Sequence, residues 1–302
     1  MYLDTFTLPI DFEEPMIQKQ CERNGGIYGY IDNTYPCRMF GNRELYEISF
    51  KNVTIFYGGN GSGKSTLLNL IAQKLELNRI APFNSSELFD EYVKNCEYSL
   101  GYDDKGFKHK IPDGSRIITS DDIFDYMLTI RTNNDEIFEK KDIARDEYGA
   151  LKYGKSIRFS GMDDYEQFKM QVMSRRKSVS RRKFIERTAG KETELFSNGE
   201  TALKYFKTKL KNDKLYCLDE PENSMSAKMQ LKLVKMLEEM SHYCGCQLII
   251  ATHSPFLLAM DNAKIYDLDS NPVEVKDWWE LENTKIYYEF FKKHRNLFEN
   301  NI

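Results

Sequence analysis

The sequence lacks a hydrophobic run long enough to cross a membrane. No uninterrupted apolar stretch approaches the roughly 20 residues that a membrane-spanning helix needs. The N-terminus, MYLDTFTLPIDFEEP, has acids and a proline where a secretory signal would have a basic start and an apolar block. These absences argue against membrane insertion and secretion, and they predict a cytoplasmic protein.

Cysteine spacing and net charge also exclude several classes. The six cysteines are scattered, and the close pair Cys244 and Cys246 has no second pair at zinc-site spacing. A chain of 302 residues needs no disulfide scaffold, so we expect reduced thiols. The formal net charge of -4 gives no global reason to expect nucleic-acid binding, which would have to depend on a local basic cluster.

What is present is the composition of a globular protein, with 41% hydrophobic and 30% charged residues. Short strand-like segments fill residues 1–50, and 85–190 is polar, aromatic-rich and mostly helical, with a helix starting at Ser120 or Asp121. From 195 onward, apolar strands alternate with helices, which predicts a doubly wound, mostly parallel α/β sheet. We therefore expect a single domain over 1–302, interrupted by a helical insertion at 85–190.

A glycine-rich loop carries the clearest motif. Gly58, Gly63, Lys64 and Ser65 satisfy the spacing G-x-x-x-x-G-K-[ST], after the apolar strand NVTIFY and before the helix STLLNLIAQKLEL. Glycines let backbone N–H groups surround phosphate oxygens, the lysine reaches the outer phosphates and the serine ligates Mg²⁺. A fortuitous glycine-rich turn is the alternative, but the strand and helix favour a nucleoside triphosphate site. The expected binding residues are Gly58, Gly59, Asn60, Gly61, Ser62, Gly63, Lys64, Ser65 and Thr66.

Two acids end the strand in LYCLDEPEN. Asp219 is placed to support Mg²⁺, which makes Ser65 and Asp219 the expected metal ligands, and Glu220 is placed to polarise the attacking water. The alternative is an acidic strand end in solvent. Ligands of open α/β sheets bind at the carboxyl ends of the strands, where these acids lie, and this favours the catalytic interpretation.

Two further segments have both a structural and a functional interpretation. His253 ends the strand LIIATHS; a lone histidine is usually structural, but its place after Lys64 and Glu220 in chain order predicts a sensor of the γ-phosphate. In LFSNGET, Ser197 and Glu200 fit a helix-capping box. That box leaves Gly199 unexplained, and a glycine there suits close approach of a phosphate.

In this order, the glycine loop, the S-x-G-E helix, the D-E strand and the T-H-S strand resemble ABC-type ATPase heads, the group that includes SMC and RecF-like proteins. GGNGSGKST, with Asn60, matches the loop; LFSNGE resembles the ABC signature and PENSMSA the D-loop. The full pattern is similar to small bacterial AAA-family ATPases of the ABC-like kind. The match spans roughly residues 50–295 and is most specific between 195 and 270.

The resemblance implies a mechanism. Two heads would enclose two ATP molecules with Mg²⁺, and each copy would complete the other's site with Ser197 and Gly199, so a homodimer is implied. Three family features have no clear match: the glutamine that binds Mg²⁺ (Gln73 lies too close to the loop), the adenine-stacking aromatic (Phe40 and Tyr46 are candidates) and the Q-x-Q-R helix of transporters.

A basic segment lies between Lys169 and Lys191, where Glu186 is the one acid in a run containing the triplet RRK twice. It fits a sequence-blind contact with the phosphates of DNA or RNA. It also fits a solvated helix face, or the acidic side of a partner protein. In IYDLDS, the D-x-D could belong to a nuclease, but too few residues follow it, so we expect a hairpin around Ser270–Pro272 with surface aspartates.

The sequence therefore predicts an enzyme that hydrolyses ATP to ADP and phosphate. ATP-driven dimerisation would regulate an effector protein or clamp nucleic acid, as in DNA repair or anti-phage defence. The nucleotide-binding subunit of a membrane transporter is the alternative, and a third possibility is a scaffold that holds ATP without turning it over.

Overall fold

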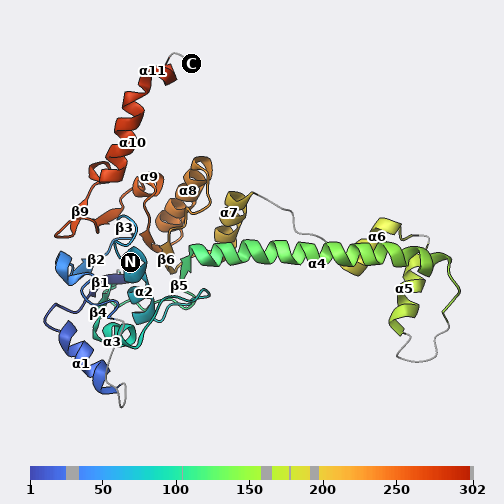
Figure 1. Ribbon diagram of the computed structural model, residues 1–302, viewed down its shortest axis with the longest axis horizontal. Helices are drawn as coiled ribbons and strands as arrows, with labels where there is room; N and C mark the ends of the chain where they lie inside the picture. Colours follow the sequence, from blue (N-terminus) through green and yellow to red (C-terminus); the bar gives the residue numbers. More distant parts are fainter. Residues whose placement is uncertain (25–33, 104, 158–164, 177, 191–196, 300–302) are drawn as a thin grey trace. The chain divides into compact units, whose positions relative to one another are not determined.

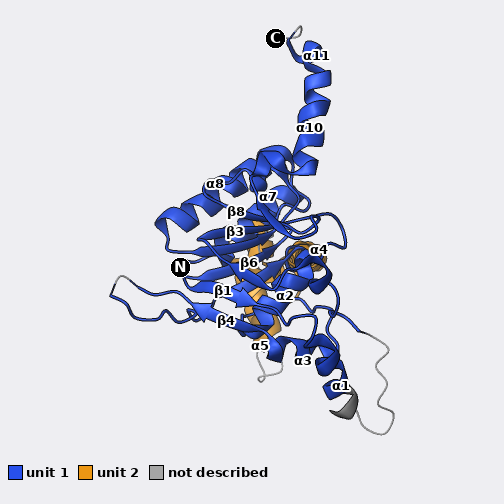
Figure 2. Cartoon of the chain, turned by 90° about the vertical axis from the view of Figure 1, so that its left-hand side faces the viewer, with its two compact units in different colours: residues 1–123, 198–302 blue, residues 124–197 orange. Residues whose placement is uncertain are grey.

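The computed structural model describes residues 1–24, 34–103, 105–157, 165–176, 178–190 and 197–299 (Figure 1). The chain divides into two compact units, coloured separately in Figure 2. Unit 1 comprises Met1–Ile123 and Asn198–Ile302, and unit 2 comprises Phe124–Ser197. Within the described residues, no helix combines the length and apolar character needed to span a membrane.

A six-stranded sheet forms the centre of unit 1, in the order β5-β6-β7-β3-β8-β9. Its strands are β3 (Val53–Tyr57), β5 (Arg116–Thr119), β6 (Leu215–Asp219), β7 (Gln247–Ala251), β8 (Lys264–Asp267) and β9 (Glu274–Lys276). The first five pair in parallel, while β9 pairs antiparallel with β8. Every residue of β3 and β7 is buried, as expected for parallel strands covered on both faces. The predicted doubly wound, mostly parallel sheet is confirmed, as is the hairpin at β8–β9.

The register of this sheet aligns the carboxyl ends of four strands. Phe56 and Asp219 are both opposite Ala251, and Thr119 is opposite Asp219. The residues that leave these strands therefore meet at one edge, which is where open α/β sheets bind ligands.

A smaller antiparallel sheet has the order β2-β1-β4, with β1 (Leu3–Thr7), β2 (Glu47–Ser49) and β4 (Glu97–Leu100). The Gln247 side chain connects it to the central sheet: its Oε1 accepts from the N–H groups of Tyr2 and Leu3, and its Nε2 donates to the Leu3 carbonyl. Helices α1 (Glu14–Asn24) and α3 (Glu87–Asn95) and the short η1 (Gly41–Arg43) complete this region. The expected N-terminal antiparallel strands are thus confirmed.

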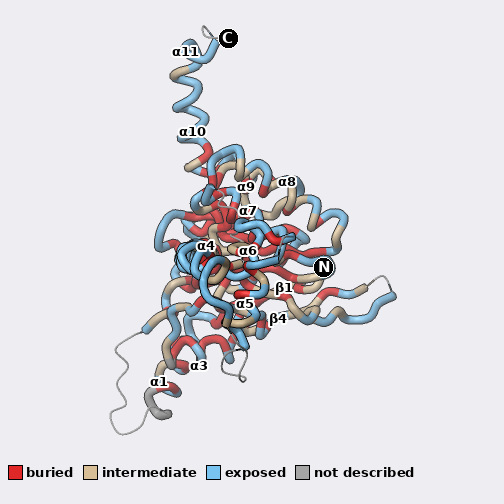
Figure 3. The backbone as a smooth tube through the Cα atoms, turned by 90° about the vertical axis from the view of Figure 1, so that its right-hand side faces the viewer, coloured by how far each residue is buried: buried red, intermediate tan, exposed pale blue. Residues whose placement is uncertain are grey.

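The remaining helices of unit 1 differ in burial, as Figure 3 shows. Helix α2 (Lys64–Lys74) is buried along most of its length, whereas α10 (Glu282–Lys293) has one buried residue, Thr284. The others are α7 (Asn198–Lys209), α8 (Ala227–Tyr243), α9 (Pro255–Leu258), η3 (Trp278–Glu280) and α11 (Arg295–Glu299).

Unit 2 is helical. Helix α4 (Ser120–Tyr153) begins in unit 1, at the predicted start, and continues into unit 2, which also contains α5 (Tyr165–Arg175) and α6 (Arg181–Ala189). Tyr148, Val179 and Phe184 form a buried apolar cluster there.

The bounds of the expected insertion differ from those of unit 2. Residues 85–123 contain β4 and β5, which pair into the two sheets, and they therefore belong to unit 1. The interpretation of 1–302 as one domain with a helical insertion stays a prediction.

Candidate active site

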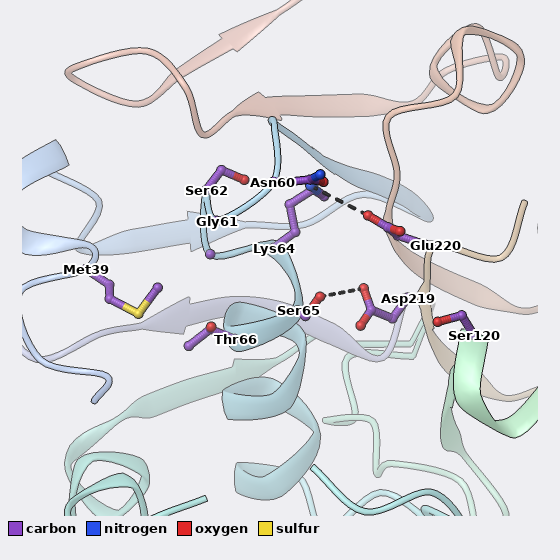
Figure 4. A pocket seen from close by; sticks show the side chains of 11 residues that line it. Met39, Asn60, Gly61, Ser62, Lys64, Ser65, Thr66, Ser120, Asp219 and Glu220 are labelled. Atoms are coloured by element: carbon purple, nitrogen blue, oxygen red, sulfur yellow. Dashed lines mark hydrogen bonds and ion pairs between the residues drawn. The ribbon is translucent and has the colours of Figure 1, made fainter. Parts of the chain in front are cut away.

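The glycine loop joins β3 to α2 and lines a cavity of about 260 Å³ (Figure 4). Gly61 and Gly63 have φ angles of 81° and 98°, in the left-handed region that glycine adopts without strain. The aromatic ring of Phe40 contacts the loop from the core, 3.1 Å from where a Cβ on Gly63 would lie. The loop therefore opens its backbone to the cavity, at the amino end of α2, where the helix dipole favours an anion.

Lys64 is held at this opening. Its ammonium donates to the carbonyls of Gly58 at 2.7 Å and Gly59 at 2.9 Å, and it lies 3.8 Å from Glu220 Oε1. The side chain is 5% exposed. Ser62 also lines the cavity, and its buried hydroxyl has no hydrogen-bond partner among the residues that the structure describes. A cation, an unpartnered hydroxyl and an open backbone together fit the phosphate groups of a nucleotide.

Ser65, in the first turn of α2, and Asp219, at the end of β6, meet at the cavity. The Ser65 hydroxyl donates to Asp219 Oδ1 at 3.0 Å (Figure 4). Burial raises the pKa of Asp219 to about 6; the bond from Ser65 opposes this shift and the nearby Glu220 adds to it. A carboxylate that is costly to ionise, beside a hydroxyl oxygen, fits the oxygen-preferring Mg²⁺, whose charge would favour the ionised form.

Glu220 follows Asp219 in a strained backbone conformation, with a φ of 44°. Its N–H donates to the carbonyl of Ala251, which ties it to the end of β7. Oε2 accepts from Asn223 Nδ2 at 3.2 Å, and Oε1 lies 3.5 Å from His253 Nδ1. Glu220 thus stands between Lys64 and His253, where it can orient a water molecule.

A second glutamate orients the histidine. Glu222 Oε1 accepts hydrogen bonds from the Thr252 hydroxyl and, at 3.3 Å, from the His253 N–H, and it lies 3.9 Å from His253 Nδ1. Burial raises the pKa of Glu222, and the bond from Thr252 opposes that shift. The sequence-based prediction assigned Glu222 no role; its place in the D-E-P-E run was the available signal.

The structure brings most of the predicted residues together. The loop residues Asn60 to Thr66 line the cavity with Asp219 and Glu220, and His253 contacts Glu220. Gly58 and Gly59 contribute the carbonyls that bind Lys64.

The two signature residues are not part of this cavity. Ser197 is exposed, while Gly199 is buried in the first turn of α7. A Cβ on Gly199 would lie 3.3 Å from Met229 Cγ and 3.5 Å from Met225 Cα. Close packing against the start of α8 is therefore a second reason for glycine at this position, and the role of both residues toward a nucleotide stays a prediction.

Several residues that line the cavity or bind the backbone of its loop were not predicted. Met39 and Ser120 line the cavity. Asp269 Oδ2 accepts from the Gly59 N–H at 2.7 Å, and Arg43 donates to the carbonyls of Ser62 and Leu268. Ser120 had a signal, because it follows β5 at the carboxyl edge of the sheet. The others come from separate loops that only the tertiary fold brings together.

The aromatic candidates for stacking on a base lie elsewhere. Phe40 is 1% exposed and packs against Gly63, while Tyr46 donates to Asp11 Oδ2 at 3.3 Å. Neither side chain lines the cavity. The expectation of surface aspartates in IYDLDS is wrong for Asp267, which is buried and paired with Lys276 at 2.7 Å.

The basic segment lies in unit 2, on α5 and α6. Several of its charges have local partners: Lys169 pairs with Glu166, Arg182 with Glu186, and Arg175 donates to the Gly154 carbonyl. Arg176, Arg181, Lys183 and Arg187 are exposed, and Lys177 and Lys191 lie outside the described residues. A contact with nucleic acid stays a prediction.

Two protein-family models match the chain. The model described as "ABC transporter" matches residues 45–223, and the model described as "AAA domain, putative AbiEii toxin, Type IV TA system" matches 193–259. No curated protein sequence matches the chain.

Similar solved structures include the SMC head domain from Thermotoga maritima, at 14% identity and a TM-score of 0.39, over 92% of this chain and 99% of that one. Another is the ATP-binding cassette MJ0796 in a dimeric post-hydrolysis state with ADP and Pi. It aligns at 16% identity and a TM-score of 0.36, over 78% of this chain and 90% of the other.

The first family model covers more than half of the chain, from the strand before the glycine loop to the acids after β6. The glycine loop, the acids Asp219 and Glu220 and the parallel sheet that positions them all lie within unit 1. The chain therefore belongs to the family that the ABC transporter model describes, that of ABC-type ATPase domains.

Proposed function

We propose that the protein binds ATP with Mg²⁺ and hydrolyses it, and that ATP joins two copies of the chain face to face. The observation that carries the proposal is the meeting of Lys64, Glu220 and His253 at the carboxyl ends of β3, β6 and β7. Each residue follows a different strand of one sheet, as expected for a site built to act on a ligand.

The residues at the cavity would have separate roles in binding the phosphates, the metal ion and the attacking water. The loop N–H groups and Lys64 bind the phosphates, while Ser65 and Asp219 would hold Mg²⁺, which offsets phosphate charge. Glu220 would orient the attacking water and accept its proton, and His253, whose Nδ1 lies 3.5 Å from Glu220 Oε1, would contact the outer phosphate. Ser197 and Gly199 of the second copy would complete the site.

The role of this cycle is proposed to be regulation of an effector protein or clamping of nucleic acid, in DNA repair or anti-phage defence. The match of 193–259 to a model named after a toxin of a toxin–antitoxin system supports defence. The exposed arginines of α6 support a salt-sensitive contact with DNA or RNA.

Glu220→Gln tests the proposal. Removing a general base lowers turnover by about 10²–10⁴-fold, while binding persists. We expect phosphate release to stop and ATP to trap a dimer, measured by light scattering after size exclusion. Glu239→Gln, on the exterior of α8, is the control. A variant that stays monomeric with bound ATP would contradict the dimer, and wild-type protein without phosphate release would indicate a scaffold.

A nucleotide-binding subunit of a transporter is the second candidate, because the matching family model carries that name. The absence of the Q-x-Q-R helix from the sequence speaks against it. Purification from membranes in a stable complex with an integral membrane protein would favour the transporter over the proposed role.

A further inference from the structure

A second cavity, of about 500 Å³, lies in unit 1 beyond His253. Its walls come from α8, α9, η3 and α10. Figure 1 labels α8, α9 and α10. Phe256, Trp278, Tyr287, Tyr288 and Phe291 give it an aromatic lining. Trp278 is 37% exposed and Tyr288 65%, so the cavity is open to solvent.

Two residues that line this cavity each have a buried polar atom with no hydrogen-bond partner in the part of the chain that the structure describes. These atoms are Oε2 of Glu222, a residue that is 4% exposed, and the hydroxyl of Thr284, which is 8% exposed. The bonds from Thr252 and from the His253 N–H both go to the other oxygen of Glu222, Oε1. Buried polar groups are almost always paired, so these two atoms are positions at which a polar group of a ligand would bind.

The chemistry of the lining selects the ligand. An unpaired carboxylate oxygen accepts a hydrogen bond most strongly from a cationic donor. Aromatic faces attract ammonium and guanidinium groups and also cover an apolar stem. We propose that this cavity binds an organic cation, whose charged group donates to Glu222 Oε2 and whose stem packs between the aromatic walls. Burial raises the pKa of Glu222, and a bound cation would favour its ionised form.

The cavity is connected to the nucleotide site. The N–H of Asn283, at the start of α10, donates to the Tyr57 hydroxyl at 3.1 Å, and its side-chain amide donates to the His253 carbonyl at 3.2 Å. Tyr57 ends the strand that enters the glycine loop. The backbone of His253 is thus bonded to Glu222 through its N–H and to Asn283 of α10 through its carbonyl. A ligand held between Glu222 and α10 would therefore contact both elements that hold His253 in place. An effect on ATP turnover would rest on the proposed function, but binding itself does not.

Titration of the whole protein with benzylamine tests the site by tryptophan fluorescence. The chain has two tryptophans, and Trp278 lines the cavity. We expect a saturable change with a Kd on the order of 1 mM, as suits a ligand of this size. Benzyl alcohol has the same shape without the charge and should bind at least about tenfold more weakly. Equal binding of the two compounds, or no saturable change, would overturn the proposal.

Variants localise the ligand. Glu222→Gln keeps the shape of the side chain and should weaken benzylamine binding at least about tenfold. Thr284→Val should weaken it severalfold, and it provides the test if the glutamine variant does not fold. Glu289→Gln removes one negative charge from the exposed side of α10, outside the cavity, and should bind as the wild type does. Unchanged affinity in both cavity variants would refute the site.

The cation could be a free amine or the side chain of a polypeptide. A blocked Gly-Arg-Gly peptide and its citrulline counterpart, titrated in the same way, distinguish these sources. Tighter binding of the arginine peptide than of benzylamine would identify a polypeptide source, and the reverse order a free amine. Binding with no effect on phosphate release would contradict only the connection to turnover.

Discussion

The two units differ in how their chemistry is held in place. In unit 1, Lys64, Asp219 and Glu220 lie near the carboxyl ends of buried parallel strands. The backbone hydrogen bonds of the sheet therefore fix the distances between them. In unit 2, a cluster of Tyr148, Val179 and Phe184 holds helices whose charged side chains face solvent. The chemistry proposed for unit 1 therefore depends on the exact positions of its side chains. Any binding by unit 2 would depend on the number of its exposed positive charges and would tolerate shifts in their positions.

Lys64→Ala tests the positional side of this comparison most strongly. The loss of the cation that we propose to contact the outer phosphates should lower ATP hydrolysis at least about a hundredfold, because electrostatic groups in a preorganised site act on the developing charge. Phosphate release and binding of a fluorescent ATP analogue are the measurements. Lys74→Ala, at the other end of the same helix, should retain activity. Comparable losses in both variants would show that the helix, rather than the ammonium, matters.

Phe184→Ala separates the two units. Removing a fully buried ring should lower the free energy of unfolding by about 3–5 kcal/mol, which should be enough to unfold a unit with so small a core. We expect proteases to cleave within unit 2 while nucleotide binding by unit 1 persists. Ile250→Ala in β7 should cost about 2–5 kcal/mol and weaken nucleotide binding as well. Loss of binding in both variants would mean that the units fold as one.

Asp219→Asn tests whether the buried carboxylate of Asp219 lowers the free energy of unfolding. The folded pKa of about 6 lies above the value of an unfolded aspartate, so the folded state binds the proton more tightly. The stability that the protonated Asp219 contributes to the folded state is fully present below the unfolded pKa and is lost as the pH rises through about 6. The asparagine variant should therefore be about 1–3 kcal/mol more stable than wild type at pH 8, and nearly equal at pH 4.

Urea unfolding at the two pH values measures this difference. Asp113→Asn, on an exposed turn, should change stability little at either pH. A destabilised Asp219→Asn at pH 8 would mean that the Ser65 bond outweighs the cost of burying the charge.

The same division explains what the sequence could predict. The glycine loop, Asp219, Glu220 and His253 follow from motif spacing, because parallel strands bring their carboxyl ends together whatever the intervening chain does. Asp269 and Arg43 act through backbone groups of distant loops and leave no local pattern. The short strands β4 and β5 were missed because they have four residues each, in a region expected to be mostly helical.

Gly199→Ala has the smallest expected effect on stability and distinguishes two explanations of this glycine. The new methyl group would lie 3.3 Å from the flexible Met229 side chain, while alanine favours the helix, so the free energy of unfolding should change by less than about 1 kcal/mol. If a partner's phosphate approaches this backbone, turnover and ATP-driven dimerisation should fall about tenfold or more despite intact folding. Ala202→Gly, one turn later on the same helix, is the reverse control: it should lower stability and leave turnover per folded molecule unchanged. Unaltered turnover in Gly199→Ala would assign the glycine to packing against α8 alone, and the proposed contribution of α7 to a second copy's site would fail with it.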